Sequence, residues 1–347
     1  MQEHEQPRTA QHDNALEHAA PHEPESAVEQ QARAAAPPQA ASFEQLTGQP
    51  AVEAPGPKPE DPAAANNTTA LTDATIEQLA HGMVAKELDD NDERFLQANG
   101  YKAMPIIRGV HEFVMRSFIP TQAGKPPIVA FRGTVPTKAQ TVIADLDPSG
   151  IGMYQFNPNR ALIEGQVQAA ASHGKIVSSG HSLGGALAQI AAATFPDAVG
   201  RIVTFQAPGV SREMAQRIVQ HNEQKPDEAI DSSHHRVEGD LVPYGGQALT
   251  PGTIHNHRMT GGSALSRNPL SKHVSMPLAQ EERAQGHEMP IPGDEHGMVA
   301  TGDVSTEQDN AEKTQMIEHA RTGLGHLVYG TGAVLHGIGQ AARKIFH

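Results

Sequence analysis

Residues 175–190 constrain the fold of this chain more than any other part of its sequence. They place a Gly-x-Ser-x-Gly motif, with Ser182 between Gly180 and Gly184, after a short apolar run and before an Ala- and Leu-rich stretch. A strand–turn–helix of this kind holds the serine in a strained backbone conformation with its hydroxyl exposed, and only glycine fits on either side of so tight a turn. The free N–H groups at the start of the helix can stabilise negative charge that develops there. We therefore predict that Ser182 is a nucleophile, with an ordinary Gly/Ser turn as the alternative.

Strand-like and helix-like stretches alternate around this motif. The expected strands, short apolar runs rich in β-branched residues, are 128–131, 175–178 and 201–205. The expected helices are 75–88, 160–172, 183–195 and 212–221, with Asp73 and Ser211 as candidate N-caps. The alternation predicts an α/β fold in which a mostly parallel sheet is covered by helices on both faces. Residues 71–280, about 210 in number, suffice for one such domain.

Charge divides the chain into four parts. Eleven acidic and three basic residues give residues 1–70 a charge of −8, and nine acidic and two basic residues give residues 281–315 a charge of −7. The first segment is also rich in Ala, Pro, Gln and Glu, so we predict a disordered acidic leader there and an acidic linker or surface loop over 281–315. Of the total of −14, residues 71–280 carry only −1, and residues 316–347 carry +2.

Composition excludes several classes of function. The chain has no cysteine, which excludes disulfides, thiolate catalysis and zinc sites built on Cys. Its acidic balance argues against nucleic-acid binding, which needs a basic face. No His-Glu-x-x-His motif and no nucleotide-binding glycine fingerprint are present, so we expect neither a metal nor a cofactor. Residues 1–20 lack the basic and apolar regions of a classical signal peptide.

Four motifs together resemble the class 3 lipase family of the α/β-hydrolase fold. They are Val129-Ala-Phe-Arg-Gly-Thr134, Ser179-Gly-His-Ser-Leu-Gly-Gly-Ala-Leu-Ala188, Val203-Thr-Phe-Gln-Ala-Pro-Gly-Val210 and His235-Arg-Val-Glu-Gly-Asp240-Leu-Val-Pro243, in the family's order. The resemblance covers about residues 95–280 and implies an α/β-hydrolase fold and acyl-ester hydrolysis. The sequence departs from the family at Gln206, where glycine is usual, and at Gly245-Gly246.

In this fold the acid and the histidine follow the serine along the chain. Asp240 ends a strand-like run, where a carboxylate would hold the histidine's tautomer and stabilise its charged form. An Asx-turn is the alternative role for Asp240. Asp227 and Asp231 lie in a polar stretch and are weaker candidates for the acid.

Five histidines after Asp240 are candidates for the base. They are His255, His257, His273, His287 and His296. The last two fall in the acidic segment, and similar proteins often carry a non-catalytic histidine near the first two. Residues 271–276 resemble the family's His-x-x-Tyr ending with Met276 in place of Tyr, so we select His273 and keep the other candidates open.

An oxyanion hole needs two donors directed at the developing charge. The N–H of Leu183, directly after Ser182, is one. The resemblance places Thr134 as the other and gives Arg132 a bracing role in the same loop. Residues 137–159, which follow, are either a lid over an acyl pocket or an excursion that packs in the core.

Residues 316–347 predict a glycine-patterned helical tail. Pairs of glycines recur every seven residues from Gly323 to Gly339, and residues 322–342 contain no Asp, Glu, Lys or Arg. Small residues at this spacing allow close helix approach in membranes. One interpretation is a helix that lies on or conditionally inserts into a membrane, and the other is a flexible or docked tail.

These observations predict a serine acyl-ester hydrolase acting on lipids, either phospholipase A-like or acylglycerol-lipase-like. An esterase or acyltransferase with the same residues, or a catalytically silent membrane- or partner-binding protein, is the alternative. The acidic leader and the tail suggest a bacterial effector, cytoplasmic in its producer, exported by a dedicated secretion system and membrane-associated when acting. Secretion-system, chaperone or immunity partners would fit that role, and the oligomeric state stays open.

Overall fold

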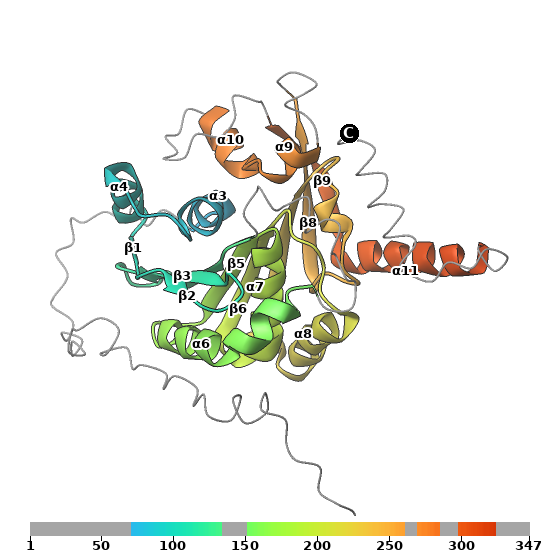
Figure 1. Ribbon diagram of the computed structural model, residues 1–347, viewed down its shortest axis with the longest axis horizontal. Helices are drawn as coiled ribbons and strands as arrows, with labels where there is room; N and C mark the ends of the chain where they lie inside the picture. Colours follow the sequence, from blue (N-terminus) through green and yellow to red (C-terminus); the bar gives the residue numbers. More distant parts are fainter. Residues whose placement is uncertain (1–70, 134–150, 261–268, 285–297, 324–347) are drawn as a thin grey trace, which may run out of the picture. The chain divides into compact units, whose positions relative to one another are not determined.

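A mixed β-sheet forms the centre of the protein (Figure 1). The computed structural model describes residues 71–133, 151–260, 269–284 and 298–323, with side chains in the last helix described up to residue 315. The strands are β1 (Tyr101–Ala103), β2 (Ile107–Arg108), β3 (Val114–Pro120), β4 (Ile128–Phe131), β5 (Ile176–His181), β6 (Val199–Phe205), β7 (Asp231–Val237), β8 (Gly252–Met259) and β9 (Met298–Ser305). Their order is β1-β3-β4-β5-β6-β7-β8-β9, with β2 paired to β3. Strands β4 to β8 are parallel, whereas β1, β2, β3 and β9 pair antiparallel.

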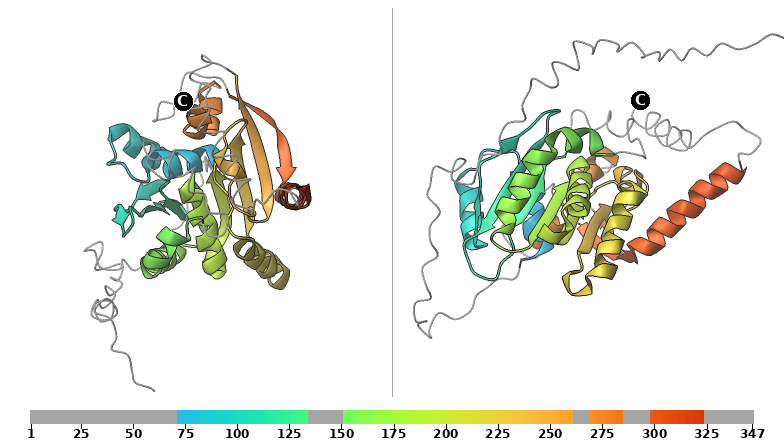
Figure 2. Two further views of the ribbon diagram at one scale, coloured as in Figure 1. Left: turned by 45° about the vertical axis from the view of Figure 1, so that its right-hand side comes forward. Right: turned by 90° about the horizontal axis from the view of Figure 1, so that it is seen from below.

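Helices cover both faces of this sheet, as the alternation of the sequence predicted (Figures 1 and 2). One face carries α6 (Met153–Ala171), α7 (Leu183–Thr194) and α8 (Arg212–Gln224). The other carries α3 (Asp73–Glu77), the π-helix η1 (Gln78–Met83), α4 (Asp90–Ala98) and α10 (Pro277–Ala284). The remaining helices are α9 (Pro269–His273), α11 (Thr306–Gly323) and the 3₁₀ turns η3 (Pro196–Ala198), η4 (Pro226–Glu228) and η5 (Val242–Tyr244).

Two apolar cores follow from the alternation of side chains along the strands. In β4, Val129 and Phe131 point to the core beneath α6 and α7, while Ile128 and Ala130 point to the core beneath α3 and η1. All four are fully buried, which explains why this strand reads as a continuous apolar run.

The helix starts agree with the sequence at one candidate N-cap and differ at the other. The hydroxyl of Ser211 accepts a hydrogen bond from the N–H of Met214, 3.3 Å away, and caps α8 as expected. Thr72 rather than Asp73 caps α3, and the expected helix over 75–88 ends as a π-helix at Met83. The carboxylate of Asp73 is bound to Arg201 instead, at 2.8 Å, and so does not serve as the cap.

The expectation of a linker over residues 281–315 is wrong in its second half. Residues 298–305 form β9, which pairs antiparallel with β8, and α11 follows at once. In β9 only Met298 is buried, so backbone pairing and not an apolar face holds the strand. The described part of the sheet therefore extends beyond residue 280, where the domain was expected to end.

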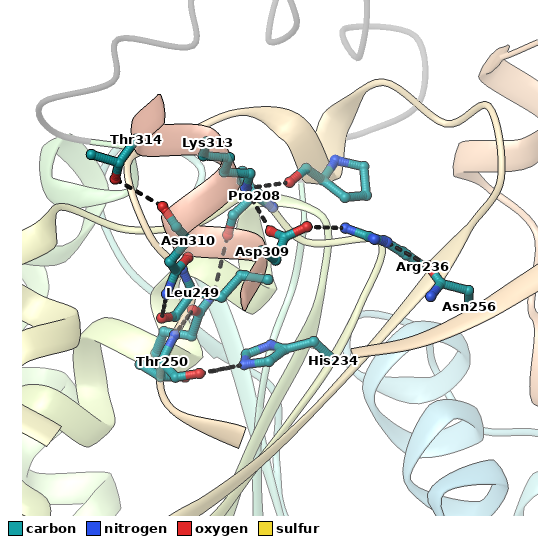
Figure 3. A network of polar contacts seen from close by, with 12 residues as sticks. Pro208, His234, Arg236, Leu249, Thr250, Asn256, Asp309, Asn310, Lys313 and Thr314 are labelled. Atoms are coloured by element: carbon teal, nitrogen blue, oxygen red, sulfur yellow. Dashed lines mark hydrogen bonds and ion pairs between the residues drawn. The ribbon is translucent and has the colours of Figure 1, made fainter. Parts of the chain in front are cut away.

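Polar contacts attach α11 to the domain (Figure 3). Asp309 accepts a hydrogen bond from Arg236 of β7 at 2.8 Å, and the side chain of Asn310 pairs with the backbone of Leu249 in both directions at 3.0 Å. Lys313 donates to the carbonyl oxygen of Pro243 at 3.3 Å. The helix thus braces the segment between β7 and β8.

Several expectations lie outside the described residues: the leader over 1–70, Thr134, the first part of the expected lid, His287, His296 and the tail beyond residue 323. Residues 153–159 of the expected lid belong to α6, where Phe156 is buried in the core and Tyr154 is exposed. Among the helices that the structure describes, none has the length and apolar character needed to cross a membrane.

Candidate active site

A strained turn between β5 and α7 presents Ser182. Its φ of 55° and ψ of −129° lie in a region that non-glycine residues rarely occupy. The flanking glycines are required by close contact. A Cβ on Gly180 would lie 2.3 Å from the carbonyl carbon of Gly184, and one on Gly184 would lie 2.1 Å from the carbonyl oxygen of Phe131. Strand, turn and helix therefore form the nucleophile elbow that the motif predicted.

Ser182, His273 and Asp240 form a hydrogen-bonded chain at the carboxyl edge of the sheet. The Nε2 atom of His273 lies 2.8 Å from Ser182 Oγ, and its Nδ1 atom lies 2.9 Å from Asp240 Oδ2. All three side chains are buried. Since the carboxylate accepts a hydrogen bond from Nδ1–H, Nε2 is left unprotonated and can accept the hydrogen bond of the serine hydroxyl.

Asp240 also fulfils its alternative role. Its Oδ1 atom accepts a hydrogen bond from the N–H of Val242 at 3.0 Å, which is an Asx-turn. One oxygen thus fixes the turn after β7 while the other faces His273. The two interpretations of this residue are therefore compatible.

The structure separates the other described candidates from Ser182. His255 Nδ1 lies 2.9 Å from Asp303 Oδ1, and His257 Nε2 lies 3.1 Å from Nδ1 of His235. Asp231 begins β7, at the opposite end of the strand from Asp240, and Asp227 lies in η4. The described residues therefore bring only His273 and Asp240 to the serine.

Of the two expected oxyanion donors, the structure describes Leu183, which lies at the elbow. Leu183 is the first residue of α7, where the backbone N–H has no acceptor within its own helix. Gly133, directly before Thr134, lies so close that a Cβ there would meet the carbonyl oxygen of His181 at 2.6 Å. Arg132 donates to the carbonyl oxygen of Glu112 at 2.7 Å, in the bracing role that the sequence predicted for it.

Two further histidines that the sequence did not single out lie beside His273. The rings of His81 and His181 are stacked 3.8 Å apart, and the His181 ring lies 4.9 Å from that of His273. Burial lowers the pKa of His81 to about 4 and that of His181 well below its ordinary value, and His273 contributes further to both shifts. Both rings are therefore neutral at pH 7 and do not compete with the charge that His273 would acquire.

His181 also contacts the backbone of His273. Its Nε2 atom lies 2.6 Å from the carbonyl oxygen of that residue, so a neutral ring protonated at Nε2 donates there. The elbow motif contains His181 and could have drawn attention to it, whereas His81 is one histidine of twenty, without a motif.

The described residues contain no group of three or more His, Cys, Asp or Glu side chains arranged to hold a metal ion. A buried serine hydroxyl, an imidazole and a carboxylate in one hydrogen-bonded chain beside a helix N-terminus have the geometry that acyl transfer would need.

The elbow on a mostly parallel sheet, followed in sequence by acid and histidine, defines an α/β-hydrolase. A phospholipase-like family model, described as the Tle-like phospholipase domain, matches residues 64–281, and the chain belongs to this family. This confirms the assignment to a lipase family and places the domain among lipid ester hydrolases. No curated protein sequence matches the chain.

Solved structures of lipases are similar to parts of the chain. A crystal structure of a fungal lipase shares 15% identity over 55% of this chain and 77% of its own, with a TM-score of 0.38. The mono- and diacylglycerol lipase from Aspergillus oryzae shares 16% identity over 55% and 80%, with a TM-score of 0.37. The M37 lipase shares 13% identity over 49% and 68%, with a TM-score of 0.35.

Proposed function

We propose that this protein is a serine hydrolase that cleaves acyl esters of phospholipids at Ser182. The contact of His273 with both Ser182 Oγ and Asp240, at 2.8 and 2.9 Å, is the observation that carries the proposal. These three residues are far apart in sequence, and no other role accounts for a buried serine hydroxyl that meets a carboxylate-bound imidazole on a strained turn.

The reaction proceeds through an acyl-enzyme. His273 accepts the proton of Ser182 as Oγ attacks the acyl carbonyl, and the N–H of Leu183, with Thr134 as the second donor, stabilises the oxyanion. The proton on His273 passes to the departing glycerol oxygen, which leaves as a lysophospholipid. His273 then deprotonates a water molecule, which attacks the acyl-enzyme. The ester bond to Ser182 Oγ breaks, His273 returns the proton to that oxygen, and a fatty acid is released.

Phospholipid is favoured over acylglycerol as the substrate because the family to which the chain belongs is phospholipase-like. Incubating the protein with phosphatidylcholine/phosphatidylethanolamine liposomes and, separately, with triolein emulsions tests this choice by the fatty acid released. We expect release from the phospholipid, and faster release from triolein would favour the acylglycerol lipase instead.

The nucleophile is tested by Ser182→Ala with Ser179→Ala as the matched control. Ser179 is a fully buried serine on β5, three residues before Ser182, and its hydroxyl has no hydrogen-bond partner in the described part of the chain. We expect Ser182→Ala to lower kcat about 10³-fold or more and Ser179→Ala to leave it unchanged. Equal turnover by Ser182→Ala and wild-type protein would show that Ser182 is not the nucleophile.

The two alternative functions predict different results in the same assay. An acyltransferase would give an acylated alcohol in preference to free fatty acid when glycerol is added as acceptor. A silent binding protein would bind liposomes without turnover, and Ser182→Ala would behave as wild type. Release of fatty acid that depends on Ser182 but not on an added alcohol excludes both.

The effector role follows from sequence features alone, the acidic flank and the glycine-patterned tail. If the protein attacks membranes after export, directing it to the periplasm of a bacterial host should slow growth and release lysophospholipid. Ser182→Ala directed to the same compartment is the control. Equal growth inhibition by both forms would argue against toxicity through lipid hydrolysis.

A further inference from the structure

Gln206, one of the two departures from the resembled family's pattern, has a backbone conformation that is unfavourable for any residue except glycine. It directly follows β6, and its φ of 43° lies in the left-handed region where glycine is preferred. Backbone hydrogen bonds hold the turn on both sides. The N–H of Gln206 donates to the carbonyl oxygen of His235 at 2.8 Å, and the carbonyl oxygen of Phe205 accepts from the N–H of Ser182 at 2.9 Å.

The side chain of Gln206 extends to the segment that carries His273. It is fully buried, and its Nε2 atom donates to the carbonyl oxygen of Ser275 at 2.9 Å. The same atom lies 3.3 Å from the carbonyl oxygen of Lys272 and from the hydroxyl of Ser275. One amide group therefore binds the backbone on both sides of the histidine.

The carbonyls of Lys272 and Ser275 lie in the last turn of α9 and just after it. Helix α9 has only five residues and ends at His273, so it forms few hydrogen bonds of its own, and the hydroxyl of Ser275 donates to the carbonyl oxygen of Lys272 at 2.7 Å. Gln206 binds the carbonyl of Lys272, and His181 binds that of His273 at 2.6 Å. Donors from β5 and from the end of β6 thus fix the position of the histidine relative to Ser182.

A purely structural role explains Gln206 poorly. Glycine would adopt its φ without strain, and the Oε1 atom of Gln206 is buried with no hydrogen-bond partner among the described residues. Strained and unsatisfied groups of this kind are characteristic of functional sites.

We propose that Gln206 is a positioning residue for the hydrolytic reaction, which sets the distance between His273 Nε2 and Ser182 Oγ through the carbonyls of Lys272 and Ser275. The inference rests on the proposed function, since it requires His273 to act as the base. Gln206 itself touches neither of the reacting atoms.

Three substitutions distinguish the effect of losing the N–H donors of Gln206 from the effect of changing the size of its side chain. Gln206→Gly removes the side chain and relieves the backbone, while Gln206→Met and Gln206→Leu keep a side chain of similar size without hydrogen-bond donors. We expect all three to lower kcat about 10- to 100-fold with KM unchanged, because a shift of about 1 Å in a catalytic group has that effect. Phosphonylation of Ser182 by a fluorophosphonate should slow in parallel, and Gln206→Gly should keep the wild-type Tm.

Gln280→Met is the matched control. Gln280 is a buried glutamine in α10 of the same region, and neither of its amide atoms has a hydrogen-bond partner among the described residues. Its substitution should leave kcat unchanged. Wild-type kcat in Gln206→Gly, recovery of kcat in the Met or Leu variant, or loss of the folded state by circular dichroism in all three would overturn the proposal. Ser182→Ala is measured alongside, because full activity of that variant would refute the proposed function rather than the role of Gln206.

Discussion

At the scale of single residues, the candidate active site combines groups whose hydrogen bonds and pKa values are set by their surroundings. Ser182 and Asp240 could be selected from the sequence because motif, order and strand ends limit the choice, whereas His273 could be preferred to four other histidines only through the family resemblance of residues 271–276. The position of His81 and the contacts of Gln206 could not be predicted. No sequence pattern indicates that His81 stacks on the ring of His181, or that the amide of Gln206 donates to the backbone of Ser275.

Asp240→Asn tests the orienting role of the carboxylate. An amide at this position can donate to Nδ1 of His273 and favours the wrong tautomer, so we expect kcat to fall about 10⁴-fold while the fold persists. Steady-state hydrolysis of a soluble short-chain ester measures the loss, and circular dichroism checks the fold. Asp231→Asn, at the opposite end of β7, is the control and should retain activity. A small effect of Asp240→Asn would mean that the Asx-turn is the main role of this residue.

At the scale of elements, the sequence predicted β4, β5, β6, α7 and α8 well because their apolar patterns match their burial. It failed at β9 and α11, whose residues are mostly polar and exposed. Backbone pairing with β8 and polar contacts with Arg236 and Leu249 hold these elements, and neither kind of contact depends on an apolar period. An acidic, turn-rich stretch therefore resembled a linker.

The attachment of α11 is tested by Asp309→Ala. This carboxylate is 10% exposed and pairs with Arg236, which is 15% exposed, so its loss leaves a largely buried guanidinium without its partner. We expect the free energy of unfolding to fall by about 2 kcal/mol, less than the 3–5 kcal/mol of a fully buried pair. Glu213→Ala, which breaks the exposed pair with Arg217, should cost about 0.5 kcal/mol or less. Equal losses in urea unfolding would show that the α11 contact is no stronger than a surface pair.

At the scale of the whole molecule, buried neutral histidines make the fold sensitive to acid. Burial lowers the pKa values of His81 and His234 to about 4, and it lowers those of His181 and His235 as well. His235 lies 2.9 Å from Asp73, but burial outweighs this carboxylate, so we treat the pair as a hydrogen bond from a neutral ring. Below pH 6.5 the unfolded chain binds protons that the folded protein does not, and stability therefore falls as pH falls.

His81→Phe tests this linkage. The ring stack is kept while one titrating group is removed, so between pH 6.5 and 5 the free energy of unfolding should fall less steeply than in wild type. The difference in slope should reach at most about 1.4 kcal/mol per pH unit. Urea unfolding at a series of pH values measures the slope. His173→Gln removes an exposed histidine and should leave the slope unchanged. An identical slope in His81→Phe and wild type would mean that His81 is not held neutral by burial.

The antiparallel pairing of β9 has a practical consequence for anyone who shortens this protein. A chain ending at residue 281, where the family match ends, would retain Ser182, Asp240 and His273 but lose β9. The backbone of β8 would then be an open edge, which pairs readily with the edge of another molecule. Light scattering should show self-association of the shortened protein and none for a protein that ends at residue 323. The solubility of the protein would then depend on β9, a strand that contains none of the three residues proposed for the reaction.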